Sequence, residues 1–99
     1  MSDAVGLTAH ATRHDDRVVF HLSGELDLAT VPILDRLLAQ NAQGDIEVDC
    51  SELNFLDSSG LGVLLSTSKS RSITLVHPNE LIMSVLDITG VKDLFRIVP

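Results

Sequence analysis

The hydrophobic residues of this chain switch repeatedly between the spacing of a strand and the spacing of a helix. After two strand-like segments at residues 7–12 and 17–22, helical segments alternate with further strand-like runs up to the last residues. Strands separated by helices join as parallel neighbours through right-handed crossovers, because only that hand packs each helix back onto the sheet. We therefore predict an α/β fold with a mixed four- to five-stranded sheet and about three helices, in the order ββαβαβαβ.

Capping and turn residues set the bounds of these segments. Thr30 can cap a helix that carries Pro32 in its first turn, where the missing N–H of proline is harmless. Gly90 predicts a left-handed stop for the last helix. The apolar run at 73–76 predicts a central strand buried on both faces, whereas residues 51–57 read as a loop. The predicted strands lie at 7–12, 17–22, 46–50, 73–76 and 95–98, and the predicted helices at 31–40, 58–69 and 79–89.

The composition fits one small domain over residues 1–99. Hydrophobic residues make up 44% and only three aromatic residues, all Phe, are present, so we expect an aliphatic core. The single cysteine, Cys50, cannot form an internal disulfide, and we interpret it as a small buried hydrophobic residue. The chain begins without the pattern of a signal peptide, and its apolar runs are short for a membrane span. We expect a cytoplasmic protein.

Acidic residues are concentrated in the middle of the chain. The formal net charge is −7, which disfavours binding to nucleic acid or to an anionic membrane. Between Glu25 and Asp57, inclusive, eight acids accompany one base, Arg36. Such a segment either attracts a basic partner or forms an ordinary solvated surface, and the sequence leaves both possibilities open.

The segment from Asn54 to Gly62 concentrates the residues that could carry chemistry. Ser58 and Ser59 follow Asp57 at a predicted helix start, where free N–H groups favour anions. Glycine costs about 1 kcal/mol inside a helix, so the glycines at 60 and 62 indicate a close approach or tight packing. The alternative is purely structural: Asp57 or Ser58 caps the helix, and Gly62 permits contact with the sheet.

Three runs of residues together resemble a known family. The run FLDSSGLGVLL resembles the signature of STAS domains of the anti-sigma factor antagonist family. The run VVFHLSGELDLATVPIL resembles the second strand and first helix of that family, and VLDITGVKDLFRIV resembles its last helix and strand. Since the resemblance covers nearly the whole chain, it implies a STAS-type fold.

The resemblance also implies a function by partner switching. In that family a serine kinase, which is also the anti-sigma factor, phosphorylates the first hydroxyl after the Asp; that position is Ser58 here. The unphosphorylated antagonist binds the kinase and frees the sigma factor, and a phosphatase restores it. We expect a monomer whose partner-binding residues are Glu25, Asp27, Asp57, Ser58, Ser59, Gly60 and Gly62. The alternative is a non-phosphorylated STAS scaffold, or interaction module, in a sensory complex.

The sequence departs from the family pattern at two places. The helix after Ser58 is several residues short, and His77 stands where the family has an asparagine before proline. These departures leave the acceptor segment intact, but they bear on which kinase is recognised.

Other chemistries find little support in the sequence. The run LDSSG lacks the first glycine of a nucleophile elbow, and neither a Walker loop nor a dinucleotide fingerprint is present. We expect no enzyme activity, cofactor or metal site. The acids at 49, 52 and 57 lack the paired acids and the lysine of a receiver-type magnesium site. The four histidines lack the spacing of metal ligands: His10, His14, His21 and His77.

Overall fold

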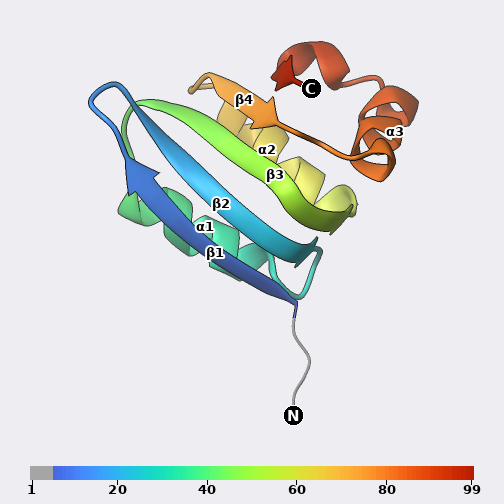
Figure 1. The fold of residues 1–99 in the computed structure, drawn as a ribbon, viewed down its shortest axis with the longest axis horizontal. Coiled ribbons are helices and arrows are strands. Elements are labelled where there is room, and N and C mark those ends of the chain that lie inside the picture. The colour runs from blue at the N-terminus through green and yellow to red at the C-terminus, as the bar shows by residue number, and fades with distance from the viewer. Residues whose placement is uncertain (1–5) are drawn as a thin grey trace.

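The computed structural model describes residues 6–99 and has the predicted order of elements, ββαβαβαβ (Figure 1). The strands are β1 (Leu7–Arg13), β2 (Arg17–Leu26), β3 (Asp45–Leu56), β4 (Ile73–Val76) and β5 (Arg96–Val98). The helices are α1 (Val31–Gln40), α2 (Ser58–Ser68) and α3 (Glu80–Thr89), and a short 3₁₀ turn, η1 (Lys92–Leu94), precedes β5. No helix within residues 6–99 has the length and apolar character that crossing a membrane requires.

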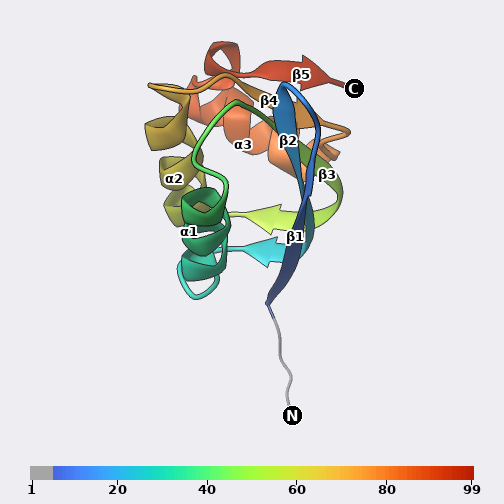
Figure 2. The ribbon, with the colours of Figure 1, turned by 90° about the vertical axis from the view of Figure 1, so that its left-hand side faces the viewer.

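The five strands lie in the sheet in the same order as in the chain, β1-β2-β3-β4-β5. Strands β1 and β2 are antiparallel and the remaining neighbours are parallel. Because each right-handed crossover advances in the same direction, all three helices are placed on one face of the sheet (Figure 2). Within residues 6–99, the opposite face has no helical cover, so the fold has two layers.

The core lies between the sheet and the helices. Alternate residues of β2 and β3 point into it, among them Phe20 and Val48, while their neighbours face the uncovered side. Leu34, Leu64 and Leu86 contribute from the three helices and are all buried. Apart from Phe20, Phe95 and Cys50, the buried hydrophobic residues are aliphatic, as the composition predicted.

Cys50 belongs to this core and is 2% exposed, as the sequence predicted. Removal from water disfavours the thiolate and raises the pKa of the thiol to about 12. The side chain therefore stays neutral near pH 7 and packs as a small hydrophobic group.

The prediction of a loop over residues 51–57 was wrong, because β3 continues to Leu56. The pairing register with β2 shifts twice, between His21 and Ser23 and again between Gly24 and Glu25, as extra residues of β3 bulge out. These bulges change the burial period from two residues to three, so that Leu53 and Leu56 are buried although they lie outside the alternation. A period-two pattern therefore ends in the sequence before the strand ends in the structure.

The predicted stop of the second strand at Ser23-Gly24 was also wrong, since β2 continues to Leu26. Gly24 has a φ of +110° and sits directly against the Gly6 carbonyl oxygen, where a Cβ atom would collide. The same oxygen accepts a hydrogen bond from the Glu25 backbone N–H at 2.8 Å. Gly24 therefore permits a close backbone approach inside the strand and does not end it.

Strand β4 occupies the interior position that its apolar run predicted, between β3 and β5. The expectation of burial on both faces was wrong, because Thr74 and Val76 are only half-buried on the uncovered face. The helix that follows ends at Gly90, which has the predicted left-handed conformation with a φ of +74°.

His77 adopts a left-handed conformation, with a φ of +58°, at the exit of β4. Its backbone N–H donates to the Val98 carbonyl at 2.7 Å, and its Nδ1 donates to the Pro99 carbonyl at 3.0 Å. Asparagine and histidine both occur in the left-handed region more often than most residues. The family's asparagine and this chain's histidine are therefore compatible with the same backbone.

Candidate functional site

The carboxyl ends of β2 and β3 bring the two motif segments together. Glu25 pairs with Phe55, and Leu26 pairs with Leu56, in parallel register. The segment SGELD therefore lies beside the segment DSSGLG, about thirty residues later in the chain. The candidate residues from both segments therefore lie at one carboxyl edge of the sheet, where ligands and partners of open α/β folds commonly bind.

Asp57 links the start of α2 to the loop that follows β2. Its Oδ1 accepts a hydrogen bond from the Gly60 backbone N–H at 3.0 Å, which caps the helix. Its Oδ2 accepts one from the Leu28 backbone N–H at 3.2 Å, and its own N–H donates to the Leu26 carbonyl at 3.2 Å. Both carboxylate oxygens are thus bound by backbone groups, and Asp57 fixes the position of the loop relative to α2.

Asp27 organises the other side of this edge. Its Oδ1 accepts hydrogen bonds from the backbone N–H groups of Ala29 at 3.0 Å and Thr30 at 3.1 Å. Thr30 occupies the N-cap position, but its side chain makes no capping hydrogen bond. Its hydroxyl is buried and donates to the Glu25 carbonyl at 2.8 Å. The prediction that Thr30 caps α1 was therefore right in position and wrong in mechanism.

The two serines differ in exposure. Ser58 and Ser59 are the first residues of α2; the Ser58 side chain is exposed, and that of Ser59 is half-buried. Ser59 lines a groove between α1 and α2 together with Asp35 and Leu38. Of the two hydroxyls, that of Ser58 is the more accessible to another protein.

The two glycines of α2 have different surroundings. A Cβ atom on Gly60 would lie 2.7 Å from Cγ of Leu26 and 3.0 Å from its carbonyl oxygen. Gly60 is therefore required for α2 to start directly over the end of β2. Outside its two chain neighbours and the backbone of its own helix, a Cβ atom on Gly62 would meet no heavy atom of residues 6–99 within 4 Å, so the suggestion that Gly62 permits contact with the sheet was wrong.

Two hydrophobic side chains at this edge were missed by the sequence analysis. Leu28 is 74% exposed and Phe55 is 39% exposed. With Asp27, Ala29 and Asp57 they line an open hollow of about 430 Å³. Exposure could not be seen in the sequence, because it depends on the β3 bulges and on the conformation of the loop after β2.

Comparison with known proteins decides the family. The family model described as "Mlab, STAS domain" matches residues 9–99. The anti-sigma-B factor antagonist of Staphylococcus epidermidis is 32% identical over 101 aligned positions, which cover 94% of each chain. This chain belongs to the STAS-domain family of anti-sigma factor antagonists.

Solved structures of similar fold extend the comparison. An anti-sigma factor antagonist from Mycobacterium paratuberculosis superposes on this STAS domain with a TM-score of 0.85 at 24% identity, over 100% of this chain and 91% of that one. Unphosphorylated SpoIIAA gives a TM-score of 0.74 at 24% identity, over 93% and 89% of the two chains. The phosphorylated form of SpoIIAA, a Bacillus cell fate determinant, gives 0.66 at 22% identity, over 93% and 92%. These structures support the STAS-type fold.

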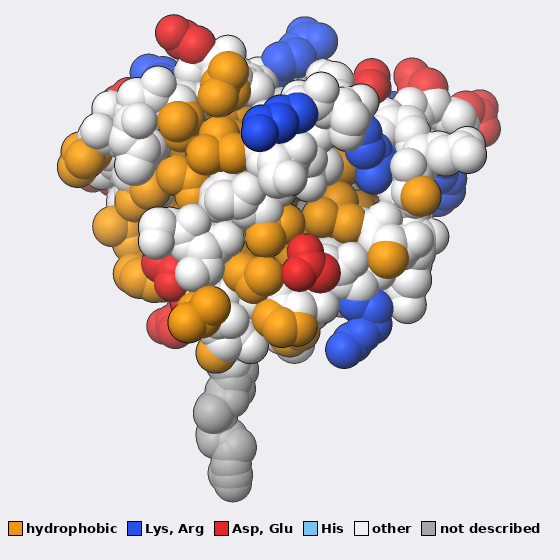
Figure 3. All heavy atoms as spheres, turned by 180° about the vertical axis from the view of Figure 1, so that it is seen from behind, with side chains coloured by type: hydrophobic (Ala, Val, Ile, Leu, Met, Phe, Trp, Pro, Cys, Tyr) orange, Lys and Arg blue, Asp and Glu red, His pale blue; other side chains and the backbone are white. Residues whose placement is uncertain are grey.

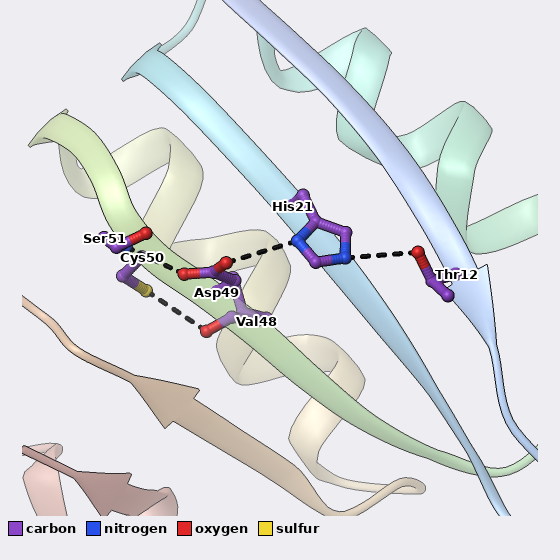
Figure 4. Close-up of polar contacts among 6 residues, drawn as sticks. All are labelled: Thr12, His21, Val48, Asp49, Cys50 and Ser51. Atoms are coloured by element: carbon purple, nitrogen blue, oxygen red, sulfur yellow. Dashed lines mark hydrogen bonds and ion pairs between the residues drawn. The ribbon is translucent and has the colours of Figure 1, made fainter.

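The STAS domain carries a second polar cluster on the uncovered face of its sheet (Figure 4). His21 Nδ1 lies 3.2 Å from Asp49 Oδ2, and His21 Nε2 lies 3.2 Å from Thr12 Oγ1. The Ser51 backbone N–H donates to Asp49 at 3.0 Å, and together with the Ser51 side chain and His21 it holds the pKa of that carboxyl below its ordinary value. The His10 ring stacks on that of His21 at 4.6 Å. Within residues 6–99, no three His, Cys, Asp or Glu side chains are arranged to hold a metal ion.

Proposed function

We propose that this STAS domain binds an anti-sigma factor serine kinase, so that the sigma factor is released, and that phosphorylation of Ser58 ends the binding. A phosphatase then restores the antagonist. The observation that carries this proposal is the exposed Ser58 hydroxyl at the first position of α2, directly after Asp57. The partner-binding surface assigned by the proposal comprises Glu25, Asp27, Asp57, Ser58, Ser59, Gly60 and Gly62. The proposal treats residues 1–99 as one domain that acts as a monomer in the cytoplasm.

Electrostatics explains how one phosphate can act as a switch. The phosphate adds about −1.5 to −2 charges to an edge that already carries Asp27 and Asp57. Where a partner surface matched to a neutral hydroxyl brings an acid to ~4 Å from the phosphate, that like-charge pair costs about 4 kcal/mol at an effective dielectric near 20, which corresponds to roughly a thousandfold in Kd. Within the domain, the start of α2 offsets part of the repulsion between the phosphate and the neighbouring acids, because helix N-termini favour anions. The switch therefore needs no rearrangement of the fold.

The arrangement of Asp57 supports the same proposal. Because backbone N–H groups bind both of its oxygens, the backbone that precedes Ser58 is held on two sides. A kinase would then meet the acceptor hydroxyl in a fixed position, which reduces the entropy that the encounter must remove.

The test is incubation of the purified protein with anti-sigma factor kinases and ATP, followed by intact-mass and site-mapping mass spectrometry. We expect one phosphate on Ser58, none on Ser58→Ala, and an unchanged result for the control Ser66→Ala, an exposed serine of the same helix outside the assigned surface. Calorimetry should then show kinase binding by the unmodified protein and a loss of about a thousandfold after phosphorylation. Kinase binding that phosphorylation leaves unchanged would contradict the switch, and binding without any phosphate transfer would favour the non-phosphorylated scaffold.

A further inference from the structure

Most hydrophobic side chains of this fold are buried. The edge of the sheet at the carboxyl ends of β2 and β3, beside Ser58, exposes two large ones. Leu28, 74% exposed, belongs to the loop after β2, and Phe55, 39% exposed, lies near the end of β3. They line the same hollow, so they form one apolar surface although they come from different elements. A contiguous apolar surface rimmed by polar groups is a common mark of a protein–protein contact.

The fold holds these side chains outward on a fixed backbone. The Leu28 N–H is bound by Asp57, and the next N–H, that of Ala29, is bound by Asp27. Phe55 is exposed between the buried residues Leu53 and Leu56 of β3, and the register shift lies between Leu53 and Phe55. A partner therefore loses little binding free energy in ordering this surface.

The charge around the hollow indicates what kind of surface fits it. Asp27 and Asp57 lie in its lining beside Leu28 and Phe55, and Glu25 precedes them at the same edge of the sheet. Of the described residues that line the hollow, none is basic. The complementary surface consequently presents an apolar side chain next to an Arg or Lys.

Other apolar side chains are exposed on the face that bears the helices (Figure 3). Ile88 on α3 is 84% exposed, more than Leu28, but the acid beside it, Asp87, lies 3.6 Å from Lys92 Nζ. Because Lys92 already balances the charge of Asp87, a cationic partner would gain less attraction at Ile88 than at Leu28. Ile88 is therefore a suitable control position.

We propose that Leu28 and Phe55 are the apolar anchor for the kinase, which contributes an apolar side chain flanked by a cation. This inference rests on the proposed function, because it names the chemistry of the partner at the same edge. It assigns affinity to the apolar pair and orientation to the acids. A phosphate on Ser58 would lose hydration at the border of the apolar contact, and this desolvation cost opposes binding.

The experiment measures Kd for an anti-sigma factor kinase by calorimetry with unphosphorylated wild type, Leu28→Ala, Phe55→Ala and Ile88→Ala. We expect Leu28→Ala and Phe55→Ala each to weaken binding about tenfold or more, and Ile88→Ala to change it less than about twofold. Leu28→Met should restore binding, because it keeps an apolar side chain of similar size. Thermal unfolding of each variant separates loss of contact from loss of fold, and Leu28→Ala should unfold at the wild-type temperature.

The outcomes separate the two proposals. If wild type binds and is phosphorylated while Leu28→Ala and Phe55→Ala bind as well as wild type, the anchor is overturned and the proposed function stands. If all variants weaken binding equally, Ile88→Ala included, the contact is not specific to this edge and the anchor is likewise overturned. If wild type binds none of the kinases, both proposals are overturned.

Discussion

Two polar regions of this domain use their acids differently. On the uncovered face of the sheet, the acids pair with basic side chains, Asp49 with His21 and Glu47 Oε2 with Arg17 Nε at 2.9 Å, and Asp49 also accepts the Ser51 backbone N–H. At the carboxyl edge, Asp27 and Asp57 bind backbone N–H groups of the fold. The first region joins neighbouring strands through charged side chains, whereas the second holds a backbone in place and leaves Leu28 and Ser58 exposed.

This difference separates structure from function. A solvated sheet face needs only polar cover, and cross-strand pairs supply it at a modest gain in stability. The carboxyl edge differs in that Leu28 and Phe55 share one hollow with two acids, an arrangement of apolar surface rimmed by polar groups that is common at protein–protein contacts.

The largest effect on stability is expected at Gly60, in the carboxyl edge. Gly60→Ala forces a methyl group against Leu26, with its carbonyl oxygen only 3.0 Å from the ideal Cβ position. Overpacking of this kind should lower the free energy of unfolding by about 2–3 kcal/mol, as measured by urea denaturation.

Gly62→Ala is the matched control for this substitution. It adds the same methyl group to the same helix, but at a position with open space around it. It should raise the free energy of unfolding by about 1 kcal/mol through helix propensity. If both substitutions had the same sign, the assigned role of Gly60 would be wrong.

A smaller effect is expected when the carboxylate of Asp57 is removed. Asp57→Ala loses the helix cap and the hydrogen bond to the Leu28 N–H, and should lower the free energy of unfolding by about 1–2 kcal/mol. Hydrogen exchange should show faster exchange of the Gly60 and Leu28 amides than in wild type. Asp57→Asn, which keeps one acceptor oxygen, should be milder; equal protection of these amides in Asp57→Ala would contradict the role of Asp57 as a link.

The smallest effect is expected on the uncovered face. Asp49→Asn should lower the free energy of unfolding by less than about 1 kcal/mol at pH 7, because Asp49 and His21 are partly solvated. The pKa of Asp49 is held below its ordinary value of 3.8, so the carboxylate stabilises the fold above that pH. The stability difference between wild type and Asp49→Asn should shrink as the pH falls below 3.8.

Denaturation at pH 7 and pH 3 measures that difference. A loss larger than that of Asp57→Ala would break the comparison between the two regions, since it would place the greater structural demand on the uncovered face.

Much of the fold could be predicted from the sequence because local signals agree with it. Changes in the spacing of hydrophobic residues predicted the order of elements, and Gly90 predicted the left-handed conformation that ends α3. The extension of β3 could not be predicted, since its bulges depend on how β2 lies beside it. At the site, the two motif segments were expected to act together, and the sheet does place them side by side. The exposure of Leu28 and Phe55 was not predictable, because burial is decided by tertiary packing.

The identical order of strands in the sheet and in the chain has a consequence for how the protein is made. Each new strand is added at the free edge beside its predecessor, so no strand has to enter between two that have already paired. The chain leaves the ribosome with its N-terminus first during synthesis. A nascent chain that has emerged to Val76 already contains β1 to β4, α1 and α2, and with them Asp27, Asp57 and Ser58. The elements of this carboxyl edge thus leave the ribosome before α3 and β5 do.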